Sequence, residues 1–339
     1  MPVEQASSEA ADGGHLIRPG GVGDAVTANN SLTPLALSID LLALAAVAAT
    51  LAGFGGDVHW LLDLTAHFRW YWFLAASGCL VAAAWQRRWL AATLAVSATL
   101  INLWFLLPYW VPSEQGIDTG TPLEIVSLNL LADNPATDRV LAYLRTRDAD
   151  VVVLLEVSEA WAEALGQLDT LYPYRVIEPR DDMFGIALLS QWPLAEPRVL
   201  TPADGPPAIV AVLEREESAC LLVAAHPPAP ISAEWTAWRD AQLAALGQLV
   251  AAADRPTILA GDLNTTPWSG GFRRLLATSG LRDSALGQGI QATWNAHRPV
   301  PRIPIDHVLV SPEIRVVFRG IGRSVGSDHL PVEARLVVP

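Results

Sequence analysis

Three long apolar stretches in the first third of the chain constrain its fold more than any other feature. They cover residues 35–54, 70–85 and 89–110, and the only charged residue among them is Asp40. A helix that crosses a bilayer needs roughly 20 apolar residues, with a range of about 17–25. The second stretch reaches this range only as residues 68–86, with Arg69 extending its charge to the surface. We predict three transmembrane helices over residues 34–110.

Tryptophan and tyrosine lie at the ends of these stretches, as in the aromatic belts of membrane interfaces. The alternative is three buried helices of a soluble bundle, but such helices normally carry a polar face. Asp40 would cost about 2.5–3.5 kcal/mol at a bilayer centre. Because it lies near the start of the first stretch, we interpret it as a tolerated residue near the headgroups and not as a proton relay.

Few charges are available to orient the helices. Arg87 and Arg88 lie in the turn between the second and third stretches, whereas the loop at residues 55–67 carries two aspartates and no arginine. The positive-inside rule therefore places Arg87 and Arg88 in the cytoplasm and everything after Trp110 outside it, although Arg69 argues weakly the other way. We predict a multi-pass protein of the cell membrane, with its C-terminal part outside the cytoplasm.

The segments that flank the helices are rich in small residues. Residues 1–33 show no apolar periodicity and no secretory signal, so we expect a disordered tail. Residues 111–122 contain two prolines and two glycines and are expected to be a linker. The two cysteines, Cys79 and Cys220, cannot form a disulfide framework. Cysteine usage therefore does not indicate the cellular compartment in which the protein lies.

From residue 123 to the C-terminus, strand patterns alternate with helical ones, which predicts a single α/β domain. Strands are expected at residues 123–131, 150–155, 174–177, 185–190, 208–214, 220–225, 257–260, 305–310, 314–318 and 332–337. Helices are expected at residues 137–147, 158–168, 233–253 and from about Ser269. About ten strands in one domain favour two packed sheets with outer helices.

Polar side chains recur where these strands end or begin, and strand ends converge on one rim in layered α/β folds. The candidates are Asn129, Glu156, His226, Asp262, Asn264, Asp306, Asp328 and His329. Taken singly, each has an ordinary structural explanation, such as a turn that Asp and Asn favour, a helix N-terminal charge or a loop histidine. Together they form a rim of oxygen donors that suits Mg²⁺ better than zinc, because no close set of His or Cys ligands appears.

Five of these motifs together resemble the endonuclease/exonuclease/phosphatase superfamily, which includes DNase I-like nucleases. The motifs are Ser127-Leu128-Asn129, the strand that ends in Glu156, Gly261-Asp262-Leu263-Asn264-Thr265-Thr266-Pro267, Ile305-Asp306-His307-Val308 and Ser327-Asp328-His329-Leu330-Pro331-Val332. The resemblance covers residues 123–339 and implies a four-layer α/β sandwich of two packed mixed sheets. The preceding helices are similar to those of membrane-anchored bacterial members.

The resemblance also implies a metal site. Glu156 would be the main ligand of Mg²⁺, with Asn129 beside it and Asp328 near the metal or the histidine; Mn²⁺ is expected as a substitute. Two departures from the family pattern are Leu155, where many members carry Gln, and Leu131, where some nucleases carry an acid. Both weaken an assignment to the nucleases that act at abasic sites.

The remaining residues would perform the hydrolysis of a phosphoester by in-line attack of water on phosphorus. The resemblance implies that Asp262 positions or activates the water and that His329 lies at the scissile phosphate, oriented by Asp306. Asn264 would bind a phosphate oxygen, and His226 would be a further donor to the phosphate. The group that takes the proton of the water is left open by the sequence.

Charge limits the choice of substrate. From Thr121 onward, 26 acidic residues outnumber 18 arginines, which disfavours tight nonspecific binding of duplex nucleic acid. A phospholipid, another small phosphodiester and a nucleic acid all remain candidate substrates, and the lipid bilayer is an expected partner, whereas no obligate protein partner is evident. The alternative function is a catalytically inactive, membrane-tethered binding domain of the same fold.

Overall fold

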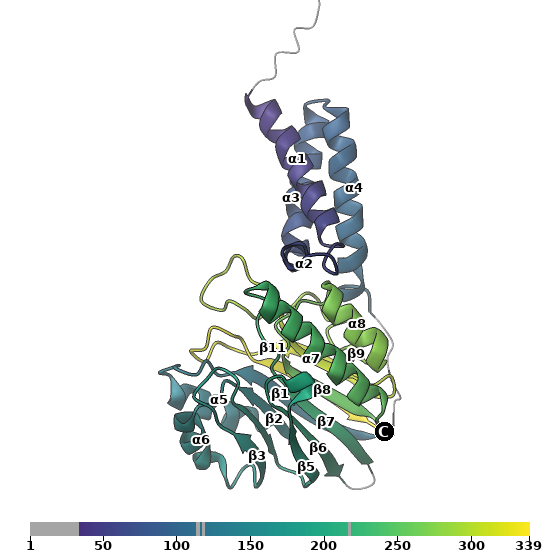
Figure 1. Ribbon diagram of the computed structural model, residues 1–339. Coiled ribbons are helices and arrows are strands. Elements are labelled where there is room, and N and C mark those ends of the chain that lie inside the picture. The colour runs from purple at the N-terminus through teal and green to yellow at the C-terminus, as the bar shows by residue number, and fades with distance from the viewer. Residues whose placement is uncertain (1–33, 113–115, 117–118, 216–217) are drawn as a thin grey trace, which may run out of the picture.

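Two six-stranded sheets form the interior of the C-terminal part of the chain (Figure 1). The structure is a computed structural model, and it describes residues 34–112, 116, 119–215 and 218–339. The tail predicted at residues 1–33 lies outside the described residues, as does part of the predicted linker. The last two residues of the predicted linker belong instead to the first strand, which begins at Thr121.

The first sheet has the order β11-β12-β1-β2-β4-β3. Its strands are β1 (Thr121–Asn129), β2 (Val151–Leu155), β3 (Tyr174–Glu178), β4 (Ile186–Ser190), β11 (Arg315–Ile321) and β12 (Val332–Val338). The central pair β1 and β2 is parallel, whereas the other neighbours are antiparallel. Every residue of β2 is buried, as a strand covered on both faces requires.

The second sheet has the order β5-β6-β7-β8-β10-β9. Its strands are β5 (Leu194–Leu200), β6 (Ala208–Arg215), β7 (Ser218–Ala225), β8 (Thr257–Asp262), β9 (Arg282–Asp283) and β10 (Asp306–Val310). Again one central pair, β7 and β8, is parallel and the others are antiparallel. Both sheets are therefore mixed, as predicted.

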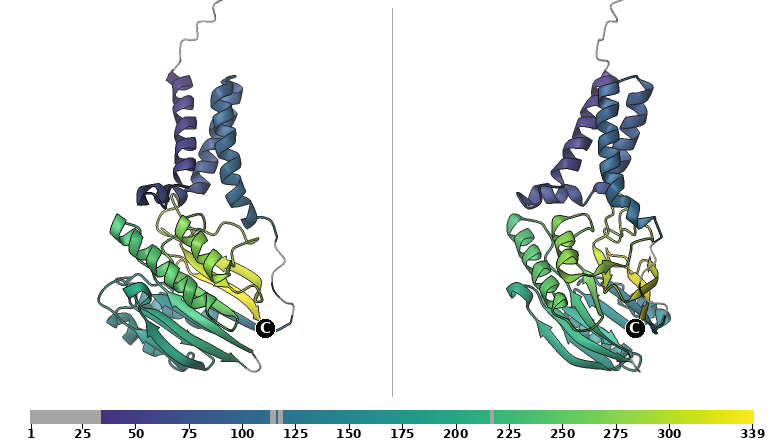
Figure 2. Two further views of the ribbon diagram at one scale, coloured as in Figure 1. Left: turned by 45° about the vertical axis from the view of Figure 1, so that its right-hand side comes forward. Right: turned by 90° about the vertical axis from the view of Figure 1, so that its right-hand side faces the viewer.

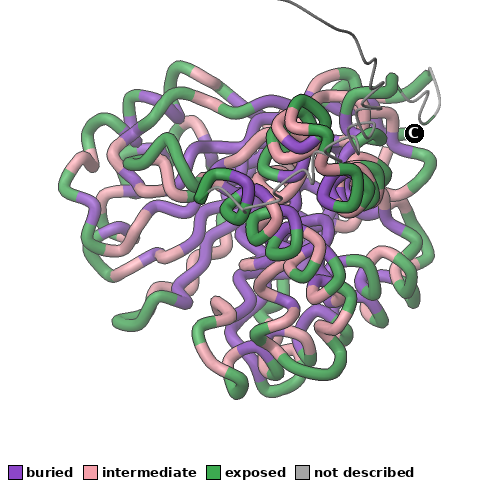
Figure 3. The backbone as a smooth tube through the Cα atoms, turned by 90° about the horizontal axis from the view of Figure 1, so that it is seen from above, coloured by how far each residue is buried: buried purple, intermediate pink, exposed green. Residues whose placement is uncertain are grey.

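Helices cover the outer face of each sheet, which completes four layers. On the first sheet these are α5 (Thr137–Arg147) and α6 (Glu159–Leu165), which continues into the short 3-10 helix η2 (Gly166–Leu168). On the second they are α7 (Ala233–Ala251) and α8 (Gly270–Ser279). The apolar faces that the two sheets turn toward each other form the central core, and buried stretches run through the interior in Figure 3. The predicted four-layer sandwich is confirmed.

Two strands were missed by the sequence analysis. Strand β5 is a sheet edge that contains Pro197 and is mostly exposed, so it lacks the apolar run of a buried strand. Strand β9 has only two residues. Neither contributes a candidate site residue.

A bundle of three long helices stands on the α/β domain (Figures 1 and 2). They are α1 (Pro34–Ala52), α3 (Arg69–Trp85) and α4 (Trp89–Leu106), which runs on into η1 (Leu107–Tyr109), and the short α2 (Trp60–Ala66) lies across the base of the bundle. The bundle interior contains Ile39 and is otherwise made mainly of alanines, which let the helices approach closely: Ala43, Ala46, Ala76, Ala83, Ala91, Ala92, Ala95 and Ala98.

Two of the described helices, and not the predicted three, are long and apolar enough to cross a membrane by length and composition. They are Pro34–Ala52 and the run Trp89–Tyr109. Helix α3 has 17 residues and begins at Arg69, which does not extend to the surface. The Arg69 guanidinium is buried over the rings of Phe54 and Phe105, 4.8 and 4.1 Å from their centroids. The prediction that the second span reaches residues 68–86 because the charge of Arg69 extends to the surface was therefore wrong.

Asp40 has a partner that the sequence did not reveal. Arg88, in the turn between α3 and α4, donates from Nε to Asp40 Oδ1 at 2.8 Å and from Nη2 to Oδ2. The turn between α3 and α4 lies at the end of the bundle that is remote from the α/β domain (Figure 1). A paired carboxylate explains how Asp40 is tolerated in an otherwise apolar helix.

The base of the bundle docks on the α/β domain through buried polar contacts. Asp63 of α2 accepts a hydrogen bond from Arg239 Nη2 of α7 at 2.8 Å, and both side chains are almost completely buried. His67 Nδ1, just after α2, accepts from the Thr266 backbone N–H at 3.2 Å. Because removing one partner would leave a buried charge or donor unpaired, these contacts fix α2 on α7 and on the loop between β8 and α8.

Candidate functional site

Asn129 and Glu156 meet because their strands are parallel neighbours. Asn129 ends β1 and pairs with Leu155 at the end of β2, so that Glu156 follows directly beside it. Asn129 Nδ2 donates to Glu156 Oε1 at 2.9 Å, and the Ala132 N–H donates to Oε2 at 3.1 Å. Glu156 has a left-handed backbone with φ of 59°. Such backbone strain in a residue other than glycine is concentrated at functional sites.

Asp262 and Asp306 face each other across the second sheet. Asp262 ends β8, Asp306 begins the antiparallel β10, and the two are direct partners in the register. Two buried carboxylates opposite each other are unfavourable unless other groups compensate them. Asp262 Oδ1 accepts from the Asn264 N–H at 2.9 Å, and Oδ2 accepts from Asn129 Nδ2 at 3.2 Å. The single amide of Asn129 thus links the rims of both sheets.

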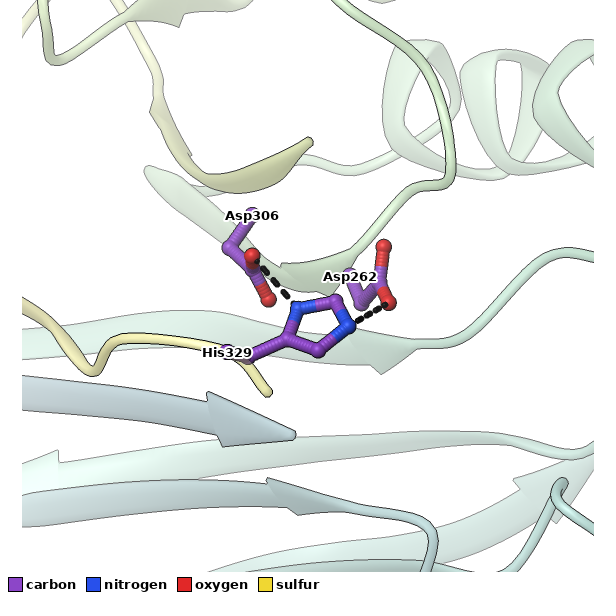
Figure 4. A group of neighbouring side chains, drawn as sticks. All are labelled: Asp262, Asp306 and His329. Carbon is purple, nitrogen blue, oxygen red and sulfur yellow. Dashed lines mark hydrogen bonds and ion pairs between the residues drawn. The ribbon is translucent and has the colours of Figure 1, made fainter. Parts of the chain in front are cut away.

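His329 compensates both aspartates (Figure 4). Its Nδ1 lies 2.9 Å from Asp306 Oδ2, and its Nε2 lies 3.6 Å from Asp262 Oδ2. The loop before β12 is held to β1 because Ser327 Oγ donates to the Asn129 carbonyl at 2.7 Å and accepts from the His329 N–H at 3.0 Å. The ring of His329 is therefore oriented from two sides.

These contacts change the protonation of the group. Burial alone would lower the pKa of His329, but the charges of Asp306 and then Asp262 outweigh it and raise that pKa to about 10. Burial and the charge of Asp306 raise the pKa of Asp262 to about 7. At neutral pH His329 is an imidazolium that donates from Nδ1 to Asp306, and its Nε2–H remains as a donor beside Asp262.

His226 and Asn264 flank Asp262 on its other side. His226 directly follows β7, and its Nε2 lies 3.6 Å from Asp262 Oδ2. Burial, together with the positive His329, lowers the pKa of His226 to about 4, so it is neutral at pH 7. Asn264 Nδ2 donates to the Pro227 carbonyl at 2.9 Å, which ties the β8–α8 loop to the segment after β7.

Asp328 lies at the rim of the group and not in its centre. Its Oδ2 accepts from Trp294 Nε1 at 2.9 Å, and both residues line the same cavity as His329. The structure therefore brings all eight candidate residues to one place, with Asp328 outside the hydrogen-bonded cluster that Asn129 organises.

The donor set fits a hard divalent cation. Each oxygen of Glu156 accepts one hydrogen bond and retains a lone pair, as does Oδ1 of Asn129, which accepts from the Leu131 N–H at 3.0 Å. Ligand atoms of Asp262, Asp306 and His329 also lie within 4.8 Å of one another. His329 Nδ1 is already engaged by Asp306, whereas both oxygens of Glu156 retain a lone pair, so Glu156 is the better anchor for an ion within this acidic group.

A cavity of about 400 Å³ opens onto the cluster. This volume is within the range of small-molecule sites, roughly 300–1,000 Å³. One end carries the polar residues Glu156, His226, Asp262, Asn264, Asp328 and His329. Apart from His67, the remaining lining is apolar and includes Leu64, Phe68, Met183, Phe184, Ile231, Trp294, Ile303 and Ile305.

Several residues of this site were missed by the sequence analysis. Arg319 of β11 is buried and donates from Nη2 to the Asp306 carbonyl at 3.0 Å. Thr293 Oγ1 accepts from the Asp306 N–H at 3.4 Å. Leu64, His67 and Phe68 come from the helical segment. None of them stands at a strand end, which was the signal that found the others.

Comparison with known proteins identifies the family. A model of the endonuclease/exonuclease/phosphatase family matches residues 102–329, well over half of the chain. The chain belongs to the endonuclease/exonuclease/phosphatase family. Its members share a phosphoester hydrolase fold, in agreement with the resemblance seen in the motifs. No curated protein sequence matches the chain.

Solved structures of other proteins show the same fold. A member from Bacteroides vulgatus is similar with a TM-score of 0.56 and 18% identity, covering 65% of this chain and 100% of the other. A member from Beutenbergia cavernae has a TM-score of 0.53 and 22% identity, covering 64% and 72%. D. rerio TDP2 complexed with a single strand DNA product has a TM-score of 0.53 and 20% identity, covering 64% and 99%. At these identities the likeness concerns the fold alone.

Proposed function

We propose that this protein is a membrane-anchored, Mg²⁺-dependent hydrolase of phosphoester bonds. One observation carries the proposal: the amide of Asn129 donates to both Glu156 and Asp262, while Asp306 orients His329 toward the same Asp262. Five chain segments thus deliver an acidic cation site and a positively charged donor to one cavity. An inactive binding domain would have no need for this arrangement, which includes a strained backbone at Glu156.

Glu156, Asn129 and Asp328 are the residues that we assign to the cation, and Mn²⁺ should replace Mg²⁺. When bound, such an ion neutralises charge that develops on the phosphoryl oxygens. Mg²⁺ is preferred in the proposal because the available donors are oxygens and the cavity leaves room for waters.

The chain's own residues carry the remaining chemistry. Asp262 accepts a hydrogen bond from the attacking water and takes its proton, a role for which a pKa near neutrality is suited. His329 Nε2–H donates to the phosphate, since Nδ1 is engaged by Asp306. Asn264 and His226 bind further phosphate oxygens. Preorganised donors of this kind stabilise the charge of the transition state without reorganising during the reaction.

Hydrolysis of bis-para-nitrophenyl phosphate by the purified full chain in detergent tests the proposal. We expect turnover that EDTA abolishes and that excess Mg²⁺ or Mn²⁺ restores. Duplex and single-stranded DNA are assayed in parallel. Turnover that survives exhaustive chelation would show that hydrolysis does not require a cation. Absence of turnover on every phosphoester would favour the inactive binding domain.

We also propose that residues 34–110 form the membrane region and residues 123–339 the catalytic domain. The helical bundle is apolar on its outside, where Leu41, Leu42, Leu90 and Leu100 are more than half exposed. Its interior holds small alanines instead. A helix bundle in lipid has this arrangement, with large apolar residues on its outside and small residues between its helices. Helix α3 packs against α1 and α4 through Ala76 and Ala83, so it would lie in the membrane region with them.

The orientation of the bundle gives a separate prediction. Arg87 and Arg88 lie at the end remote from the catalytic domain, so the positive-inside rule places that end in the cytoplasm and the catalytic domain outside. An alkaline phosphatase fused after Pro339 should therefore be active. A green fluorescent protein fused at the same point should be dark, because it would be exported together with the catalytic domain. The opposite pair of results would reverse the topology.

A further inference from the structure

We propose that the phosphoester cleaved at this site is a membrane lipid, and that Leu64 and Phe68 of the helical segment bind its hydrocarbon chain. The inference rests on the proposed function and names its substrate. It gives the N-terminal helices a role in substrate binding in addition to anchoring.

The first support is that the helical segment forms part of the active-site cavity. Leu64 of α2 and Phe68, between α2 and α3, line the same cavity as Asp262 and His329. Their position is fixed because the flanking residues Asp63 and His67 make buried hydrogen bonds to Arg239 and to the Thr266 N–H. The wall supplied by the helices is thus a built part of the site.

The second support is that other residues of the cavity lining are both apolar and exposed. Three residues from three separate loops line the cavity and remain exposed, namely Met183 at 46%, Ile231 at 68% and Trp294 at 37%. Exposed apolar side chains that gather around a cavity mark a surface for an apolar ligand or a membrane. A hydrocarbon chain that passes over this rim would remove it from water.

The third support is the location of the mouth. Leu64 and Phe68 stand at the base of the bundle, where α2 lies between the long helices and the catalytic domain (Figure 2). Trp70 and Trp110 pack against each other at the same base, with ring centroids 5.6 Å apart, as aromatic residues do at membrane interfaces. A lipid in the adjoining leaflet would then place its phosphate at His329 and its hydrocarbon chain against Leu64 and Phe68.

The charge and the size of the site disfavour nucleic acid as the substrate. Acidic residues outnumber arginines by 26 to 18 from Thr121 onward, whereas binders of nucleic acid usually present a basic face. Specific protein–DNA interfaces bury roughly 1,000–2,500 Å² of protein surface. The mouth here is bounded by the helical segment on one side, and its lining is mainly apolar.

The reaction balances as a simple hydrolysis. The oxygen of water bonds to phosphorus, and the bond between phosphorus and one ester oxygen breaks. One proton of the water is taken up by Asp262 and then passes to the leaving oxygen, which departs as an alcohol. No oxidant, reductant or further co-reactant is needed.

The test compares one headgroup on two chain lengths. Long-chain and short-chain phosphatidylglycerol are offered to the full chain in the same detergent, with bis-para-nitrophenyl phosphate as a substrate that has no chain. The variants are Leu64→Gln and Phe68→Gln, and the matched control is Leu61→Gln, which lies on the exposed side of α2 and does not line the cavity. All three are checked for folding by circular dichroism.

We expect wild type to prefer the long-chain lipid, and we expect both cavity variants to lose about 10-fold or more in the ratio of long-chain to short-chain turnover. The Leu61 variant should resemble wild type on all substrates. Aryl ester turnover without a preference for the long chain, or with a preference that both cavity variants retain, would overturn the lipid inference and leave the proposed function standing. Faster cleavage of DNA than of any lipid would also overturn it. Failure on every substrate would instead overturn the proposed function.

Discussion

Replacement of Glu156 by Gln should abolish Mg²⁺-dependent hydrolysis, with a loss of about 100-fold or more at any Mg²⁺ concentration that saturates wild type. Glutamine keeps the size of the side chain but removes the negative charge that we assign to the cation. Loss of groups that only support metal ligands typically costs 10–100-fold, so loss of a ligand itself should cost at least as much. The measurement is kcat/KM on bis-para-nitrophenyl phosphate across a Mg²⁺ titration.

Glu159→Gln is the matched control for this prediction. Glu159 is a glutamate three residues further on, at the exposed start of α6, and it does not line the cavity. It should keep wild-type activity. If Glu156→Gln were as active as Glu159→Gln while remaining folded, Glu156 would not hold the cation.

The second large effect is expected from Asp306→Asn. Asp306 keeps His329 protonated and oriented, and its charge also helps to raise the pKa of Asp262. Without that charge the pKa values of both groups fall. Because the proposed mechanism needs Asp262 deprotonated and His329 protonated, both limbs of the pH profile of kcat/KM should move to lower pH. The rate at the optimum should fall by about 100-fold or more, within the range for lost acid–base catalysis.

A buried aspartate in the same sheet separates this effect from a general loss of packing. Asp283 of β9 is buried and accepts from Tyr109 and from the Ala285 N–H, without contact to His329. Asp283→Asn should keep the wild-type pH profile even if the free energy of unfolding falls. An unshifted profile in Asp306→Asn would refute the assigned protonation states of Asp262 and His329.

Most of the fold and the candidate site follows from local sequence signals. The apolar run 151–155 has a single stable placement, as a strand buried on both faces, and Glu156 must then leave that strand at its carboxyl end. The same argument places Asn129 and Asp262, since β1 and β8 each lie parallel to a neighbour in their sheet. Helix α5 has the bounds that its pattern predicted.

Contacts between distant segments could not be obtained in this way. The hydrogen bond of Asn129 to Asp262 joins two sheets, and its length depends on how the sheets pack. The burial of Arg69 and the docking of Asp63 on Arg239 depend on complementary side chains from separate parts of the chain. Periodicity reports only which face of a segment is apolar, so it indicated a membrane helix at residues 68–86 and gave no sign that α2 forms a wall of the active site.

Direct binding of Mn²⁺, measured by electron paramagnetic resonance on the purified full chain, tests the central claim without relying on activity. We predict one saturable Mn²⁺ per chain in wild type, displaced by Mg²⁺, retained in Glu159→Gln and weakened at least about 10-fold in Glu156→Gln. Equal Mn²⁺ binding by wild type and Glu156→Gln, or no binding by either, would contradict the claim that Glu156 anchors a cation beside Asp262 and His329.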